Sequence, residues 1–328
     1  MSALDEATVE AAALEWFGEL GYAAAHGLAP DADDPTAERH GYGDVVLTAR
    51  LEAAIARLNP TVPADARREA LRRVLRADGP GTVERNRRFH QLLVDGVSVE
   101  YTGPDGSVRG DIIALVDFER PERNDWLVAN QVTIIEQKHE RRPDILIFVN
   151  GLPLGIIELK NPLDEKATLA GAFNQLQTYK HEIPALFPYN EVLVVSDGRE
   201  ARAGTLTADW ERFMPWRTID GESPVPRDTW ELEVLIKGVF RPDRFLDLVK
   251  YFIVFEAGGS RIDKKMAAYH QFHAVNKAVT ATIEASGPDG DKRVGVVWHT
   301  QGSGKSLTMA FYAGKIVQHP RMENPTLV

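Results

Sequence analysis

The chain has 328 residues, which is enough for one or two domains, and a third would have to be incomplete. Hydrophobic residues make up 44% and charged residues 26%, a globular composition that excludes disordered and fibrous classes. Cysteine is absent, which excludes disulfide scaffolds and thiol nucleophiles. The N-terminus has no signal-peptide pattern and no apolar run is long enough to cross a membrane, so we expect a soluble, cytoplasmic protein.

The net charge is negative, because 38 Lys and Arg stand against 48 Asp and Glu, giving −10. This argues against a small, uniformly basic nucleic-acid-binding domain but not against a local basic patch. Residues 67–88 hold eight arginines and three acidic residues. The segment is either a patch that binds phosphates or a solvated arginine-rich helix face, and both interpretations stay open.

The first quarter of the chain has helical patterns. Apolar residues recur every three or four positions in 6–20, and Gly21 follows as a stop. Similar patterns predict helices at 48–58 and 63–76, each ending before a proline. The glycine pair Gly41 and Gly43 lacks a third glycine and a preceding strand, so we interpret it as a loop.

From about residue 92 the pattern becomes strand-like. Strands alternating with helices predict a mixed α/β sheet covered on both faces. The predicted strands are 97–101, 111–118 (a buried strand), 145–149, 154–159 and 191–196, with a helix at 166–182. Beyond a segment of weak pattern, the predictions are an apolar helix at 241–255, a domain boundary at 257–260, a helix near 265–285 and a strand at 293–298.

A glycine-rich segment follows the last of these strands and precedes an apolar-periodic helix, the context of a phosphate-binding loop. Its glycines let backbone N–H groups surround phosphate oxygens at a helix N-terminus. Lys305 would contact the β- and γ-phosphates, and Ser306 would ligate Mg²⁺. The strict pattern starts with glycine where this chain has His299; the alternative is a glycine-rich surface turn. The predicted nucleotide-binding residues are Gly302, Ser303, Gly304, Lys305 and Ser306.

Nucleotide hydrolysis also needs an acidic pair on a later strand, and the chain reaches Val328 without one. We therefore expect the N-terminal fragment of a longer motor protein, which by itself is not a competent ATPase.

A second constellation combines two carboxylates and a lysine. Asp144 precedes one predicted strand, and Glu158 and Lys160 share a face of the next. The Asn150-Gly151 pair between the strands predicts a hairpin. A two-residue loop would turn Asp144 away from Glu158, whereas a three-residue loop with a glycine bulge puts all three polar side chains on one face. We predict the bulged loop, because burying Asp144 on the apolar face is costly.

Two carboxylates and a strand carbonyl make an oxygen site suited to Mg²⁺, which activates water and polarises a phosphodiester. Lys160 would position that water or stabilise charge developing on phosphorus. The alternative is an ordinary surface pair of Glu158 and Lys160, which the apolar neighbours disfavour. On the following helix, Gln175 and Tyr179 share a face and could hold DNA phosphates, or they are structural.

Together these motifs resemble the restriction (R, motor–nuclease) subunit of type I restriction–modification enzymes over most of the chain. The resemblance is specific because motifs for two unrelated chemistries, the carboxylate–lysine constellation and the phosphate-binding loop, occur in the same order as in that family. The residues that carry it are 142–154 (RPDILIFVNGLPL), 157–160 (IELK), 173–175 with Tyr179, 298–300 (WHT) and 302–306 (GSGKS).

The resemblance implies an α/β fold in two parts. Residues 1–256 would form a restriction-endonuclease-like, or PD-(D/E)xK, nuclease domain, and 257–328 the truncated start of a RecA-like, helicase-like ATP-binding domain. It further implies that Asp144, Glu158 and Lys160 are the nuclease triad, with Gln175 and Tyr179 as the accessory QxxxY motif. Glu10 would be a further acid near the metal, and Gln271, in Tyr-His-Gln, would read adenine.

The implied function is that of a type I site-specific deoxyribonuclease. Unmodified double-stranded DNA would be cut with Mg²⁺, coupled in the full-length protein to ATP-driven translocation. The partners would be the methyltransferase (M) and specificity (S) subunits, with S-adenosylmethionine bound by M and the target read by S. Two alternatives remain: a nucleotide-binding or motor-docking fragment with an inactive nuclease site, and a non-enzymatic fragment that docks on the methyltransferase core.

Overall fold

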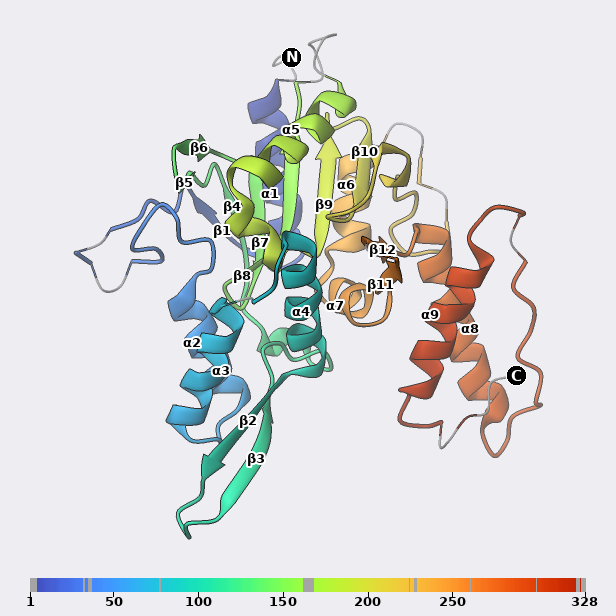
Figure 1. Cartoon of the computed structure of the whole chain (residues 1–328). Helices are drawn as coiled ribbons and strands as arrows, with labels where there is room; N and C mark the ends of the chain where they lie inside the picture. The colour runs from blue at the N-terminus through green and yellow to red at the C-terminus, as the bar shows by residue number, and fades with distance from the viewer. Residues whose placement is uncertain are drawn as a thin grey trace.

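A mixed six-stranded sheet lies at the centre of the computed structural model (Figure 1). Its strand order is β1-β4-β7-β8-β9-β10, with β1–β4 and β8–β9 parallel and the other neighbours antiparallel. The strands are β1 (Ala23–His26), β4 (Trp126–Asn130), β7 (Ile145–Val149), β8 (Leu152–Leu159), β9 (Val192–Ser196) and β10 (Ala201–Gly204). The structure describes residues 5–31, 33–34, 37–76, 78–161, 168–223, 225–226, 229–259, 261–298, 300–322 and 325.

Helices cover both faces of this sheet. In Figure 1, α5 (Leu169–Glu182) lies in front of the sheet and α1 (Glu6–Glu19) behind it, beside α6 (Glu231–Val239). Asp5 caps the N-terminus of α1, and its carboxylate accepts a hydrogen bond from the Thr8 N–H at 2.9 Å. One face of α1 buries Val9, Ala13 and Phe17, spaced at four residues, against the sheet. The central strands β7, β8 and β9 are buried along their whole length.

The remaining elements surround this core. A hairpin of β2 (Val97–Thr102) and β3 (Val108–Ile113) projects from the body at the end where α2, α3 and α4 gather (Figure 1). These helices are α2 (Thr48–Leu58), α3 (Ala64–Arg76) and α4 (Thr82–Asp95). The smaller elements are β5 (Ile134–Glu136), β6 (His139–Arg141), β11 (Ile253–Gly258), β12 (Arg261–Met266), α7 (Pro242–Tyr251), η1 (Pro121–Arg123), η2 (Pro184–Tyr189) and η3 (Trp210–Arg212). α8 (Tyr269–Ser286) and α9 (Lys305–Val317) pack together on one side of the molecule.

Much of the predicted order of elements is confirmed, including the mixed α/β sheet and the helix at 48–58 with both of its ends. The predicted buried strand at 111–118 is wrong: β3 ends at Ile113, and Ile112 is 66% exposed on the two-stranded hairpin. The predicted helix at 241–255 gives way to β11 after Tyr251, and β12 occupies the start of the predicted helix at 265–285. Residues 257–259 belong to the β11–β12 hairpin, and the domain boundary placed there stays a prediction.

The predicted strand at 293–298 is also wrong, because these residues form no strand. Val296 and Trp298 are 90% and 89% exposed. A strand needs a neighbouring strand for its backbone hydrogen bonds, and none lies beside this segment among the residues described.

The arginine-rich segment forms α3 and the start of α4. Three of its arginines pair within α3: Arg68 with Asp65, and Arg72 and Arg73 with Glu69. These are exposed pairs of the kind expected on a solvated helix face. Phosphate binding by this segment stays a prediction.

Candidate active site

The β7–β8 hairpin turns through two residues, Asn150 and Gly151, with φ of 52° and 79°. Positive φ at both positions is the geometry in which Asn-Gly is favoured. A Cβ on Gly151 would lie 2.4 Å from the Leu47 carbonyl oxygen, so glycine is required there. The prediction of a three-residue loop is therefore wrong.

Instead, a bulge within β8 shifts the pairing between β7 and β8 by one residue. Phe148 pairs with Pro153 and Ile147 with Gly155, which leaves Leu154 as the extra residue. Beyond the bulge Ile145 pairs with Ile157, and the same register continued by one residue sets Asp144 opposite Glu158. Asp144 and Glu158 therefore share a face of the hairpin, as predicted, but the bulge that brings this about lies in the strand rather than in the turn.

The Asp144 carboxylate is 7% exposed and is tied to the neighbouring strand. Its Oδ2 accepts a hydrogen bond from the main-chain N–H of Leu159 at 2.7 Å. Burial raises the pKa of Asp144 to about 6, and the negative charges of Glu6 and Glu10 add to the rise. The Leu159 N–H and the charge of Lys160 act in the opposite direction.

Glu158 is more deeply buried, with 1% exposure. One oxygen, Oε1, lies 3.2 Å from Lys160 Nζ, and the other, Oε2, has no hydrogen-bond partner of normal geometry among the residues described. The Tyr179 hydroxyl is close enough to the carboxyl group to lower the pKa of Glu158. Burial, with the charge of Asp144 second, raises the pKa of Glu158 to about 8. A buried carboxylate oxygen without a donor is costly, and a bound cation would satisfy it.

Lys160 is held from the opposite side by α5. Its Nζ donates to Gln175 Oε1 at 2.8 Å, and Gln175 Nε2 donates to the Tyr179 hydroxyl at 2.7 Å. Tyr179 is buried, and burial together with the charge of Glu158 raises its pKa. The structure thus brings together the predicted residues Asp144, Glu158, Lys160, Gln175 and Tyr179.

Glu10 approaches the site from α1. Its Oε1 accepts a bond from Asn130 Nδ2 at 2.5 Å, and its Oε2 accepts one from Gln131 Nε2. The residues described contain no group of three or more His, Asp or Glu side chains placed to hold one metal ion, so Glu10 as a ligand stays a prediction. Glu6, one helical turn before Glu10, also acts on Asp144 and was not predicted, although its spacing from Glu10 could have indicated it.

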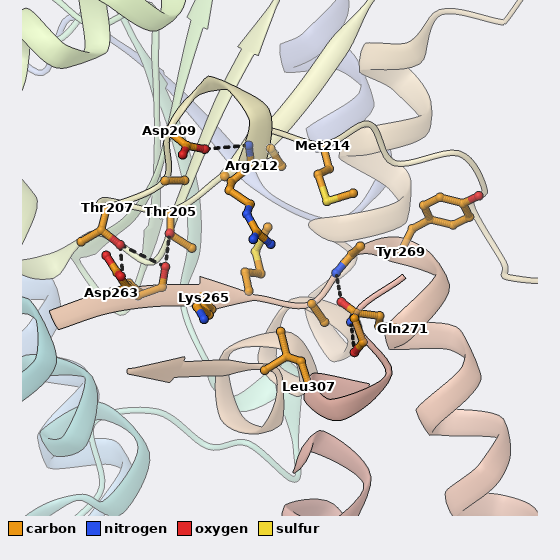
Figure 2. A pocket seen from close by; sticks show the side chains of 18 of the residues that line it. Thr205, Thr207, Asp209, Arg212, Met214, Asp263, Lys265, Tyr269, Gln271 and Leu307 are labelled. Carbon is orange, nitrogen blue, oxygen red and sulfur yellow. Dashed lines mark hydrogen bonds between the residues drawn. The ribbon is translucent and has the colours of Figure 1, made fainter. Parts of the chain in front are cut away.

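A second site surrounds the glycine-rich loop. Gly302 and Gly304 have φ of 82° and 78°, and α9 begins at Lys305, followed by Ser306. Gln271 Nε2 donates to the Gly304 carbonyl at 3.1 Å. A cavity of about 340 Å³ lies beside this contact, lined by residues that include Gln271, Leu307, Arg212 and Met214 (Figure 2). The predicted Ser303 also lines it, and His299 lies outside the described residues.

No helix in the part of the chain that the structure describes is both long and apolar enough to cross a membrane.

Comparisons with known proteins match two segments of the chain. Residues 3–212 match the family described as type I restriction enzyme R protein N terminus, and residues 270–328 match the family described as SWI2/SNF2 ATPase. The chain is 43% identical to the type I restriction enzyme HindI endonuclease subunit of Haemophilus influenzae, over 99% of this chain and 31% of that protein.

Two further relatives agree. A putative type I restriction enzyme MjaIXP endonuclease subunit of Methanocaldococcus jannaschii is 33% identical over 99% of this chain and 32% of its own length. The SauCOLORF180P endonuclease subunit of Staphylococcus aureus is 32% identical over 62% of this chain and 21% of its own length. The chain thus spans about a third or less of these relatives. The match over residues 3–212 shows that the chain belongs to the family of type I restriction enzyme R proteins and corresponds to their N-terminal portion.

Proposed function

We propose that the chain carries the nuclease centre of a type I restriction enzyme, cutting double-stranded DNA by Mg²⁺-dependent phosphodiester hydrolysis. The observation that carries this proposal is the buried Glu158 Oε2, which has no hydrogen-bond partner of normal geometry in the described part of the chain and belongs to a residue opposite Asp144 in the hairpin. The hairpin, the shared face and the lysine two residues after the glutamate fit a PD-(D/E)xK site.

Asp144 and Glu158 would hold the cation, with Glu10 nearby. When bound, Mg²⁺ would activate a water molecule and polarise the phosphodiester. Lys160, held by Gln175, places an ammonium group beside Glu158, where it can position the water or stabilise charge on phosphorus. Gln175, itself bonded to Tyr179, would hold the Lys160 side chain in this orientation.

A nucleotide site is the second proposal, favoured by the cavity beside Gln271 and the glycine-rich loop. ATP would place its base near Gln271 and its phosphates at residues 302–306, in a RecA-like domain. In the full-length protein this site would serve ATP-driven movement on DNA. The partners proposed for that protein are the M and S subunits of the same system.

The test is DNA cleavage by the full-length R protein assembled with M and S, in Mg²⁺ and ATP. Glu158→Gln and Lys160→Ala are each expected to lower cleavage of unmodified DNA by at least ~10³-fold while leaving ATP hydrolysis intact. Lys305→Ala is the matched variant in the second site and should abolish ATP hydrolysis. Wild-type cleavage by the Glu158→Gln enzyme would exclude the nuclease function and leave the nucleotide-binding alternative.

A further inference from the structure

Gln131 occupies an unusual position at the edge of the sheet. It follows β4 directly, and its φ of 56° lies in the left-handed region, which is unfavourable for a residue with a long side chain. The preceding residue, Asn130, pairs with Ile145, so Gln131 lies beside Asp144. Strained backbone of this kind persists when the surrounding contacts require it.

Two hydrogen bonds explain the conformation. The main-chain N–H of Gln131 donates to the main-chain oxygen of Asp144 at 3.0 Å. Its side-chain Nε2 donates to Glu10 Oε2. A single residue therefore joins the strand that carries Asp144 to the helix that carries Glu10.

Asn130 completes the arrangement on the other oxygen of Glu10. Its Nδ2 donates to Glu10 Oε1 at 2.5 Å, and its own Oδ1 lies 3.0 Å from His26 Nδ1. With an amide on each oxygen, the Glu10 carboxylate cannot rotate freely. Each oxygen keeps a further lone pair, which can accept a hydrogen bond from a water or coordinate a cation.

The held carboxylate lies next to the cation site, because the residue that bonds it, Gln131, also bonds the main chain of Asp144. Hydrogen bonds of this type orient carboxylates in metal sites, and their loss commonly weakens metal binding by about 10–100-fold. Mg²⁺ usually keeps several of its waters, so Glu10 can contribute through such a water without joining Asp144 and Glu158 as a direct ligand.

We propose that Gln131 is a positioning residue that fixes Glu10 beside Asp144 and thereby raises the cation affinity of the site. This rests on the proposed nuclease function. The left-handed backbone of Gln131 lowers folding stability. It is kept because it places the side-chain amide in contact with Glu10.

The test compares two glycine substitutions at left-handed positions, Gln131→Gly and Gln137→Gly. Gln137 has φ of 54° in the β5–β6 turn and is exposed. Glycine relieves the backbone at both sites, and in Gln131→Gly the main-chain bond to Asp144 remains. Both variants are expected to unfold at equal or higher urea concentration than the wild type. Only Gln131→Gly is expected to bind Mn²⁺ more weakly in calorimetry, by about 10-fold or more.

A second variant tests whether a changed backbone, rather than the loss of the Gln131 side chain, explains weaker binding. Gln131→Asn keeps a residue that tolerates positive φ but shortens the side chain, so it should weaken Mn²⁺ binding as Gln131→Gly does. Wild-type Mn²⁺ affinity in both Gln131 variants would overturn the positioning role. If Glu158→Gln binds Mn²⁺ as the wild type does, or the wild type binds none, the proposed function fails as well. Loss in Glu158→Gln with unchanged Gln131 variants refutes only the inference about Gln131.

Discussion

The Asp144 carboxylate accepts a hydrogen bond at 2.7 Å from the main-chain N–H of Leu159, the residue between Glu158 and Lys160. The Asp144 side chain is thereby fixed to the backbone of β8, the strand that carries Glu158 and precedes Lys160. The bulge at Leu154 makes this possible, because without it the register set by the Asn150-Gly151 turn would put Asp144 opposite a buried isoleucine.

The turn itself is expected to be intolerant of a side chain at Gly151. Gly151→Ala should lower the free energy of unfolding by about 2 kcal/mol or more, because the new Cβ would lie 2.4 Å from the Leu47 carbonyl oxygen. Gly106→Ala is the matched control, because its φ is 77° and none of the residues described lies within 4 Å of the new Cβ, so it carries only the cost of the backbone conformation. Urea unfolding of both variants measures the difference, and equal losses would contradict the close packing at the turn.

Stability without metal is expected to fall as the pH rises. Burial raises the pKa of Glu158 to about 8 from an ordinary 4.5, so the folded chain holds a proton that the unfolded chain has released. The contribution of Glu158 to the free energy of unfolding is therefore fully present below about pH 4.5 and is lost as the pH rises through about 8. Each unit of difference between the folded and unfolded pKa corresponds to about 1.4 kcal/mol.

Glu158→Gln removes that titration. In EDTA its unfolding free energy should decline less than that of the wild type between pH 5 and pH 9, as measured by denaturant unfolding. Glu140→Gln, at an exposed position, is the control and should follow the wild type. Parallel curves for wild type and Glu158→Gln would contradict the assigned burial of the charge.

Gln175 is expected to affect cleavage more than cation binding, because it contacts Lys160 rather than the carboxylates. Gln175→Ala should lower the rate of DNA cleavage by about 10–100-fold, with the Mg²⁺ concentration for half-maximal rate unchanged. Thr178→Ala, at an exposed position on the same helix, should leave both quantities unchanged. A shift in Mg²⁺ dependence without a loss of maximal rate would assign Gln175 to metal binding instead.

A buried ion pair joins β12 to the sheet. Lys264 Nζ lies 2.7 Å from Glu191 Oε2 and donates to the Asn190 carbonyl at 2.7 Å, with both charged side chains fully buried. Lys264→Met should lower the unfolding free energy by about 3–5 kcal/mol, because His90 is then the one remaining side-chain partner of the Glu191 carboxylate among the residues described. Adding Glu191→Gln should recover part of the loss in urea unfolding. A double variant less stable than the single one would contradict this interpretation.

The sequence predicts those features that local spacing determines. The helix at 48–58 follows from its apolar spacing and from Pro60, and the shared face of Glu158 and Lys160 follows from strand alternation. The contacts of Gln131 were not predictable, because they depend on how α1 and β4 meet in space. The bulge at Leu154 is flanked by Pro153 and Gly155, a bulge signal inside the strand that the prediction of a bulged turn did not use.

Apolar runs were the main source of error in the predicted fold. The run at 293–298 has the composition of a strand, yet the formation of a strand depends on a partner elsewhere in the chain. The run at 111–118 holds buried residues such as Leu115, but it leaves the hairpin after Ile113 and continues as irregular chain.

The central claim is that the Asp144 and Glu158 carboxylates share one divalent cation. Anomalous diffraction from crystals of this chain grown with Mn²⁺ tests it most directly. We predict a peak within coordination distance of both carboxylates, about 2.1–2.4 Å from their oxygens, that disappears in Glu158→Gln. A wild-type peak elsewhere, or no peak at saturating Mn²⁺, would contradict the claim.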